Sequence, residues 1–208
     1  MAETPTKNIT DFRKINVGCG DSLYPDYLNI GYWKELPEAG FGDYYGDGRF
    51  LLNWDLSKGI PLKENSIDTI YNCHFLEHLS FEEAFAFLRE SHRCLAPNGL
   101  MRIVVPDLRK WVKSYLEDDL LITRYREECF RSDPRYSTPG LVFMGMLHGH
   151  GHRFGWDATS LGSILSGLGF ISIRERLYQE SEISNILEIE RSHPLRALES
   201  LAIECRKP

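Results

Sequence analysis

Two glycines follow the first apolar run of the chain, in the segment INVGCG at residues 15–20. Glycine at the end of a strand lets the backbone turn sharply and lets a ligand approach main-chain N–H groups closely. A dinucleotide-binding loop would need a third glycine where this chain has Leu23, and a P-loop would need a Gly-Lys-Ser/Thr that does not follow. By itself the tripeptide fits an ordinary strand-to-loop turn and a ligand-binding loop equally well.

Histidines occur at two places where they could do chemistry. His148, His150 and His152 alternate with glycine in HGHGH, and His74 follows a strand-like run. Imidazole is a common zinc ligand, and alternation would put the three side chains on one side of an extended strand. Because the glycines make the segment flexible and no carboxylate or thiolate cluster adjoins it in sequence, we predict no metal site. We instead predict lid residues that touch an acceptor, with His74 as a candidate catalytic or substrate-binding residue.

Glu77 and His78 follow His74 in the segment CHFLEHLS. They could position a substrate or cofactor, or they could cap and pack the start of a helix. For His78 we favour capping and packing.

The elements that position these residues alternate between strand and helix along the chain. Strand-like apolar runs occur at residues 12–18, 27–33, 49–56, 66–73, 99–106, 170–178 and 199–207. Several are apolar on both faces, as in a parallel sheet covered by helices on both sides. Ser80 and Glu83 form a capping-box pattern that predicts a helix start.

The second half predicts one longer helix from Asp107 that fades near Cys129, and a short helix capped by Asp157. Between them, residues 131–157 are predicted as an irregular lid-like loop, because long loops of this kind commonly cover sites. Residues 1–11 are predicted as a polar lead-in, and 1–208 as a single domain.

The composition is that of a globular protein. The 208 residues carry a formal net charge of −6, which argues against a dedicated nucleic-acid-binding protein. No apolar run is long enough to span a membrane. Five scattered cysteines without a C-x-x-C pair favour reduced thiols and a cytoplasmic location.

Several motifs taken in order resemble the class I S-adenosylmethionine-dependent methyltransferases, especially the small type 11-like group. They are INVGCG, YPDYLNIG, WDLSKGIPLKENSIDTIY, CHFLEHLS, LRESHRCLAPNGLMRIVVPDL and HRFGWDATSLGSILSGLGF. The resemblance implies an α/β fold with a Rossmann-like, seven-stranded, mainly parallel sheet. Its last strand would be antiparallel, and helices would cover both faces. It also implies S-adenosyl-L-methionine as cofactor, over the carboxyl ends of the first strands.

The resemblance also implies a set of cofactor-binding residues. They are Val17, Gly18, Cys19, Gly20, Asp21, Gly31, Tyr32, Asp55, Leu56, Asn72, Cys73 and His74. Gly18 to Gly20 would line the methionine part, Asp21 would bond its amino group or stabilise the turn, and Asp55 would accept from the adenine amino group.

One position departs from the family pattern. The second strand normally ends in an acid that binds the ribose hydroxyls, and here Gly31 stands in its place. Tyr32, Asp43 or Asp47 could replace that acid. Otherwise the cofactor is held weakly, or the protein is a non-catalytic binding module.

The predicted function is transfer of a methyl group to a small-molecule or glycan-like acceptor, at oxygen. His74, His148, His150 and His152 are the candidate bases, with Asp107 as a further candidate. The alternative is a catalytically inactive, methyltransferase-like binding or partner subunit. A homodimer is one candidate assembly, and we expect no nucleic-acid partner.

Overall fold

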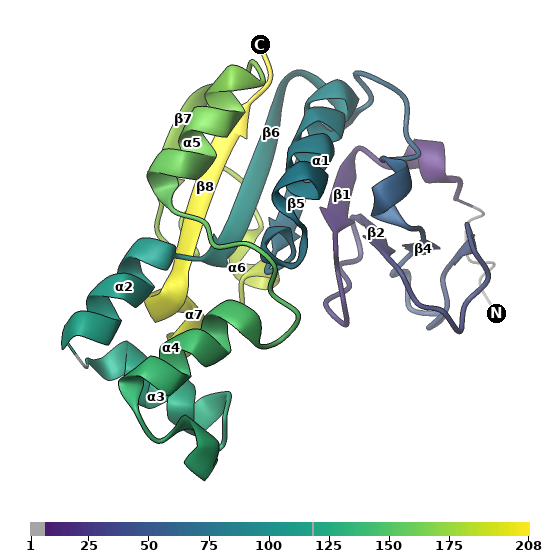
Figure 1. Ribbon diagram of the computed structural model, residues 1–208. Helices are drawn as coiled ribbons and strands as arrows, with labels where there is room; N and C mark the ends of the chain where they lie inside the picture. Colours follow the sequence, from purple (N-terminus) through teal and green to yellow (C-terminus); the bar gives the residue numbers. More distant parts are fainter. Residues whose placement is uncertain (1–6, 118) are drawn as a thin grey trace.

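The computed structural model describes residues 7–117 and 119–208, and in them eight strands form one sheet (Figure 1). The strand order is β3-β4-β2-β1-β5-β6-β8-β7. The strands are β1 (Lys14–Val17), β2 (Leu28–Gly31), β3 (Phe41–Gly42), β4 (Leu51–Asn53), β5 (Ile67–Cys73), β6 (Leu95–Pro106), β7 (Ile171–Arg176) and β8 (Ser200–Arg206). Adjacent strands from β4 to β6 pair in parallel, whereas β8 is antiparallel to both β6 and β7. The predicted mainly parallel α/β fold is confirmed, with β3 as an edge strand that was not predicted.

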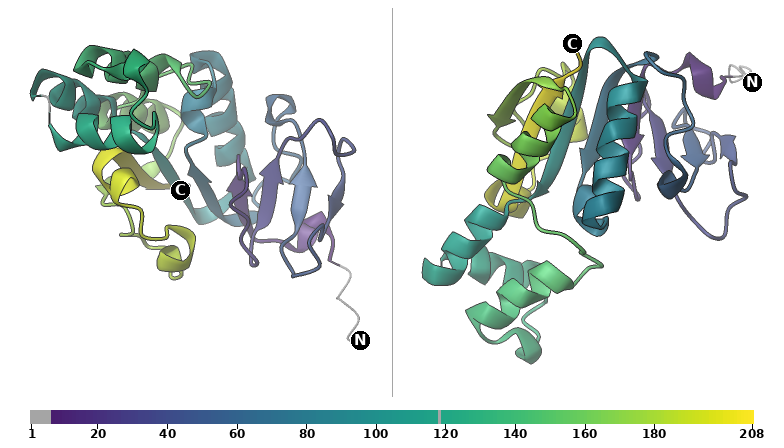
Figure 2. Two further views of the ribbon diagram at one scale, coloured as in Figure 1. Left: turned by 90° about the horizontal axis from the view of Figure 1, so that it is seen from below. Right: turned by 45° about the horizontal axis from the view of Figure 1, so that its top comes forward.

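Helices lie on both faces of the sheet and at one end of it (Figures 1 and 2). The α-helices are α1 (Phe81–Cys94), α2 (Leu108–Glu117), α3 (Leu120–Glu128), α4 (Pro139–His148), α5 (Ala158–Gly167), α6 (Ile186–Ile189) and α7 (Pro194–Glu199). The 3-10 helices are η1 (Ile9–Asp11), η2 (Leu56–Lys58), η3 (Leu76–His78) and η4 (Pro134–Tyr136). Among the described residues, no helix is both long and apolar enough to cross a membrane.

The largest core lies between the sheet and the two helices α1 and α5, which cover the same face. Leu88 of α1 and Leu165 of α5 are fully buried against strand residues such as Ile70 and Ile103. The predicted capping box starts α1, because Ser80 Oγ accepts from Glu83 N and Glu83 Oε2 accepts from Ser80 N. The capping box therefore fixes where α1 begins, shortly after η3.

The opposite face of the sheet carries a buried ion cluster beside α6. Arg102 of β6 is fully buried, and its guanidinium donates twice to the Glu190 carboxylate at 2.6 and 2.8 Å. It also donates to Glu204 of β8 and to the carbonyls of Leu177 and Glu180. These contacts use the full set of guanidinium N–H donors and attach the segment after β7 to the centre of the sheet.

Four helices form a separate apolar cluster beyond the carboxyl end of β6. Trp111 of α2, Tyr125 of α3, Val142 of α4 and Leu195 of α7 are all buried there. Two predictions are corrected in this region. The single long helix is divided into α2 and α3, and residues 131–157 contain η4 and α4 instead of a structureless loop. Thr138 and Pro139 are typical helix-start residues, and Thr138 Oγ1 accepts from Leu141 N to cap α4.

Buried asparagines organise the loops near the amino-terminal strands. Asn29 of β2 bonds Asn16 of β1 and the backbone of Tyr24, Tyr27 and Phe50. This network holds the short connection from β1 to β2 in place of a crossover helix. Of the predicted lead-in 1–11, residues 1–6 lie outside the described residues, and η1 occupies the last three.

Candidate active site

A cavity of about 750 Å³ lies at the carboxyl ends of β1, β2 and β4. Five residues of the predicted cofactor set line it: Gly18, Gly31, Tyr32, Asp55 and Leu56. Phe75 and Leu79, which flank η3, form part of its wall, and so does Arg153. An open parallel sheet places a ligand site at these strand ends.

A smaller cavity of about 310 Å³ shares Gly18 with the large one. Cys19, Asp21 and Cys73 of the predicted set line this second cavity. The other four predicted residues line neither cavity: Val17 and Asn72 are buried inside their strands, Gly20 is exposed, and His74 faces Glu77 and Ser200. Most of the predicted cofactor residues thus line one of two hollows, which share Gly18.

Gly18 and Gly20, in the loop after β1, have different surroundings. Both have a left-handed backbone, with φ +65° at Gly18 and +47° at Gly20. A Cβ at Gly18 would lie 2.2 Å from the Phe75 ring, whereas a Cβ at Gly20 would meet nothing within 4 Å. Gly18 therefore makes room for Phe75, and Gly20 leaves open space beside the loop.

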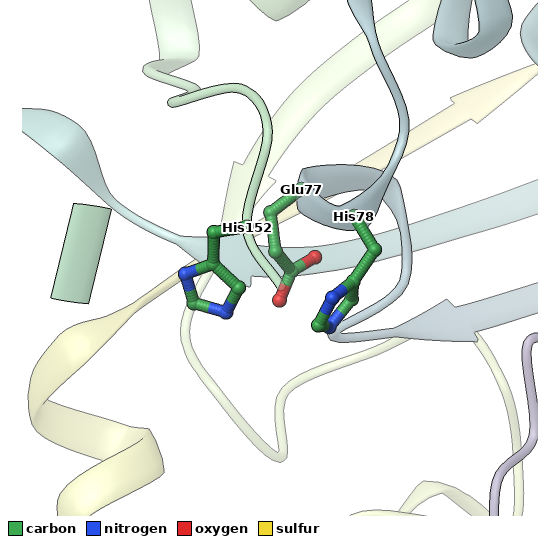
Figure 3. Close-up of side chains that lie close together, drawn as sticks. All are labelled: Glu77, His78 and His152. Atoms are coloured by element: carbon green, nitrogen blue, oxygen red, sulfur yellow. The ribbon is translucent and has the colours of Figure 1, made fainter. Parts of the chain in front are cut away.

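A polar cluster lies beside this region and consists of Glu77, His78 and His152 (Figure 3). We call it the Glu77 cluster. One ligand-type atom from each residue lies within 4.8 Å of the other two. Glu77 is 2% exposed, and neither of its carboxylate oxygens has a hydrogen-bond partner among the described residues.

Main-chain contacts bring the cluster together across a long sequence separation. The Glu77 carbonyl accepts from the N–H groups of Arg153 and Phe154, so the segment after α4 is attached to η3. His152 Nδ1 lies 2.6 Å from the carbonyl oxygen of Met146. A carbonyl can only accept, so Nδ1 carries the hydrogen and the Nε2 lone pair is left available.

The three histidines of HGHGH do not lie on one side of a strand. His150 and Gly151 adopt φ +55° and +79°, which turns the chain instead of extending it. His150 stacks on Phe130, and His148 is exposed at the end of α4. Although no carboxylate cluster adjoins these histidines in sequence, the fold places Glu77 beside His152.

His74 and Asp107 both engage neighbouring protein groups. His74 Nδ1 is 3.2 Å from Glu77 Oε1, and its Nε2 is 3.1 Å from Ser200 Oγ. Burial lowers the pKa of His74, which favours the neutral ring. Asp107 Oδ1 accepts from Arg109 N at the start of α2. Both side chains are thus placed to hold neighbouring elements.

Part of the sequence and the fold are similar to those of known methyltransferases. Residues 44–103 match a family model described as a methyltransferase domain. A methyltransferase structure from Archaeoglobus fulgidus is 16% identical, with 94% of this chain and 86% of that chain covered and a TM-score of 0.54. Residues 44–103 are therefore similar to a methyltransferase domain, and the chain shares its fold with this methyltransferase structure.

Two further solved structures share the fold of this chain. One is a methyltransferase from Mesorhizobium loti, at 16% identity and TM-score 0.50, covering 94% of this chain and 90% of that chain. The other is a Haloferax volcanii complex of a putative methyltransferase with the activator Trm112, at 12% identity and TM-score 0.51, covering 94% and 82%. No curated protein matches the sequence.

The methyltransferase domain match supports S-adenosylmethionine as the cofactor, and the two hollows fit it. The large hollow offers an exposed aromatic ring, Tyr32, and a carboxylate, Asp55, at the predicted adenosine end. Asp55 Oδ1 caps η2 by accepting from Ser57 N, and its hydrogen bonds to Ser57 lower the Asp55 pKa. The small hollow adds Arg191 and Arg196, cations that could bind a carboxylate. Sequence reasoning missed both arginines, because they follow β7 in a segment without a motif.

An aromatic ring fills the space beside Gly31. A Cβ at Gly31 would lie 2.4 Å from Trp33 Cη2, although the Gly31 backbone is outside the left-handed region. We therefore expect Gly31→Asp alone to weaken S-adenosylhomocysteine binding. With Trp33→Ala as the background, adding Gly31→Asp should tighten binding about tenfold, the size of one charged hydrogen bond. Calorimetric titration of the four proteins tests this, and tighter binding by the single Gly31 variant would contradict it.

Glu199 is another buried carboxyl of the chain, and its ionisation should affect folding. Burial raises the pKa of Glu199 to about 7; Glu77 and Glu128 add to the shift, and Arg196 and Lys110 oppose it. A carboxyl with a raised folded-state pKa stabilises fully only below its unfolded value near 4.5, and that contribution is lost as pH rises through about 7. The unfolding free energy of Glu199→Gln, relative to that of the wild type, should therefore rise by about 2 kcal/mol from roughly pH 5 to pH 8. Urea unfolding at the two pH values measures the gain, and an unchanged difference would refute it.

Proposed function

We propose that this chain transfers the methyl group of S-adenosylmethionine to a hydroxyl oxygen of a small-molecule or glycan-like acceptor. One juxtaposition supports the proposal: the segment from Phe75 to Leu79 walls the large cavity at both ends and carries Glu77 and His78 between them. A cofactor hollow and a polar cluster able to handle a proton are thus built on one short segment.

The residues that would hold the cofactor follow from the two hollows. Tyr32, Asp55 and Leu56 would contact the adenosine part, and Asp21 and Arg196 would bind the amino and carboxylate groups. The cofactor supplies a methyl carbon that already carries a good leaving group. The protein therefore has to align the acceptor and remove its proton.

The Glu77 cluster is the proposed place of that deprotonation. The Nε2 lone pair of His152 is available, because Nδ1 donates to Met146. Burial lowers the pKa of His152, so this ring is neutral near pH 7. His74 is assigned a positioning part, because its two ring nitrogens face Glu77 and Ser200.

The alternative is a binding module without turnover, which Trp33 packed on Gly31 favours. One experiment separates the two functions. The protein is incubated with S-adenosylmethionine and a panel of hydroxylated small molecules and oligosaccharides, and S-adenosylhomocysteine release is measured. Product that forms with a free-hydroxyl acceptor, and not with its O-methylated counterpart, supports transfer to oxygen. Binding of S-adenosylhomocysteine without turnover on any panel member supports the binding module instead.

A further inference from the structure

The Glu77 carboxylate is in an unusual setting for a buried acid. It is 2% exposed, both oxygens lack hydrogen-bond partners among the described residues, and only His74 Nδ1 approaches Oε1, at 3.2 Å. A buried carboxylate is costly unless it is paired, hydrogen-bonded or bound to a metal. Among the described residues, Oε1 therefore has only the His74 ion pair, and Oε2 has neither an ion-pair nor a hydrogen-bond partner.

Two imidazoles face the same point. His78 comes from η3 with Glu77, and His152 comes from the segment after α4 (Figure 3). The hydrogen bond from His152 Nδ1 to the Met146 carbonyl orients the ring and leaves Nε2 free. A histidine that ligates a metal typically donates its other ring nitrogen in this way.

We propose that Glu77, His78 and His152 bind one divalent first-row metal ion, and that this ion binds the hydroxyl oxygen of the acceptor. Two histidines and one carboxylate with open positions form a known ligand set for such ions. The second part of the inference rests on the proposed function; the first part does not.

The three ligand atoms of the Glu77 cluster must move closer together to bind one ion. Ligand atoms around a tetrahedral ion are about 3.3 Å apart at metal–ligand distances of about 2.0–2.1 Å. The atoms of the Glu77 cluster lie within 4.8 Å of one another. His78 is only half-buried, and we expect its side chain to supply the movement.

A bound cation would change the acceptor in a defined way. It stabilises the alkoxide and so lowers the pKa of the bound hydroxyl. With the ion bound, the His152 Nε2 lone pair ligates the metal, so the acceptor proton leaves to solvent instead of to His152. An electron pair of the oxygen forms the bond to the methyl carbon. The carbon–sulfur bond breaks with its electron pair remaining on sulfur, and the metal keeps its oxidation state.

The test uses Co²⁺ as the probe, because its visible absorption reports ligation directly. The full chain is stripped with a chelator and titrated with CoCl₂, and S-adenosylhomocysteine binding is measured on the same samples. We expect one Co²⁺ per chain. Glu77→Gln and His152→Ala should each weaken Co²⁺ binding by about 100-fold. If either variant fails to fold, His78→Ala replaces it, with the same expected loss. His148→Ala is the matched control, because it removes an exposed histidine from the same segment and should retain Co²⁺ binding.

The outcomes separate the two claims. Absence of Co²⁺ binding in the wild type, or equal binding in the wild type and all the cluster variants, overturns the metal site. If S-adenosylhomocysteine binds in those same samples, the proposed function survives that failure. If Co²⁺ binds at the cluster while S-adenosylhomocysteine does not, the proposed function fails and the metal site stands.

Discussion

Replacing His152 with alanine is expected to lower methyl transfer by about 100-fold or more, while S-adenosylhomocysteine affinity stays within about twofold. The ring lies in the Glu77 cluster and not in the lining of either cofactor hollow. Loss of a group that removes the acceptor proton, or that helps to lower the pKa of the acceptor hydroxyl, lowers the rate by about 10²–10⁴-fold. Initial rates and calorimetry on the same preparations measure the two effects.

The control for this prediction is His148→Ala, four residues away. His148 is exposed at the end of α4, so we expect its removal to change the rate by less than about twofold. Equal losses in the two variants would mean that the whole segment acts as a lid and that His152 has no special part.

Replacing Arg102 with methionine is expected to destabilise the fold by about 3–5 kcal/mol. The variant leaves the Glu190 and Glu204 carboxylates buried without the cation that now pairs with both. Urea unfolding near pH 7 measures the change in unfolding free energy.

The matched control is Arg13→Met, which removes an arginine from an ion pair with Asp68. Both side chains of that pair are more than half exposed, and exposed pairs contribute at most about 1 kcal/mol. If the Arg102 variant is no less stable than the Arg13 variant, the buried ion cluster makes no net contribution to the unfolding free energy.

The sheet and α1 were predictable because their signals are local. The Ser80–Glu83 capping box needs only neighbouring residues, and it forms as predicted. Apolar runs located the strands for the same reason. The edge strand β3 was missed because it has two residues, too few for any alternation pattern.

The candidate site was only partly predictable, because its assembly depends on distant contacts. The fold that the resemblance implied is present, and Gly18, Gly31 and Asp55 line the cavities, whereas Gly20 does not. Nothing local indicates that the Glu77 carbonyl binds the backbone of Arg153, which is what brings His152 to Glu77. The alternation in HGHGH was misread because a turn at His150 and Gly151 needs positive φ angles that the pattern does not reveal.

The place of β8 in the sheet bears on the order in which the protein can be built. β8 is made after β7, yet it lies between β6 and β7 and pairs with both. During synthesis, β7 therefore has no neighbour to pair with until Ser200–Arg206 has left the ribosome. Until then the free edge of β6 is exposed, and such an edge can recruit a strand from another chain. We expect nascent chains stalled before residue 200 to depend on chaperones far more than chains released after it.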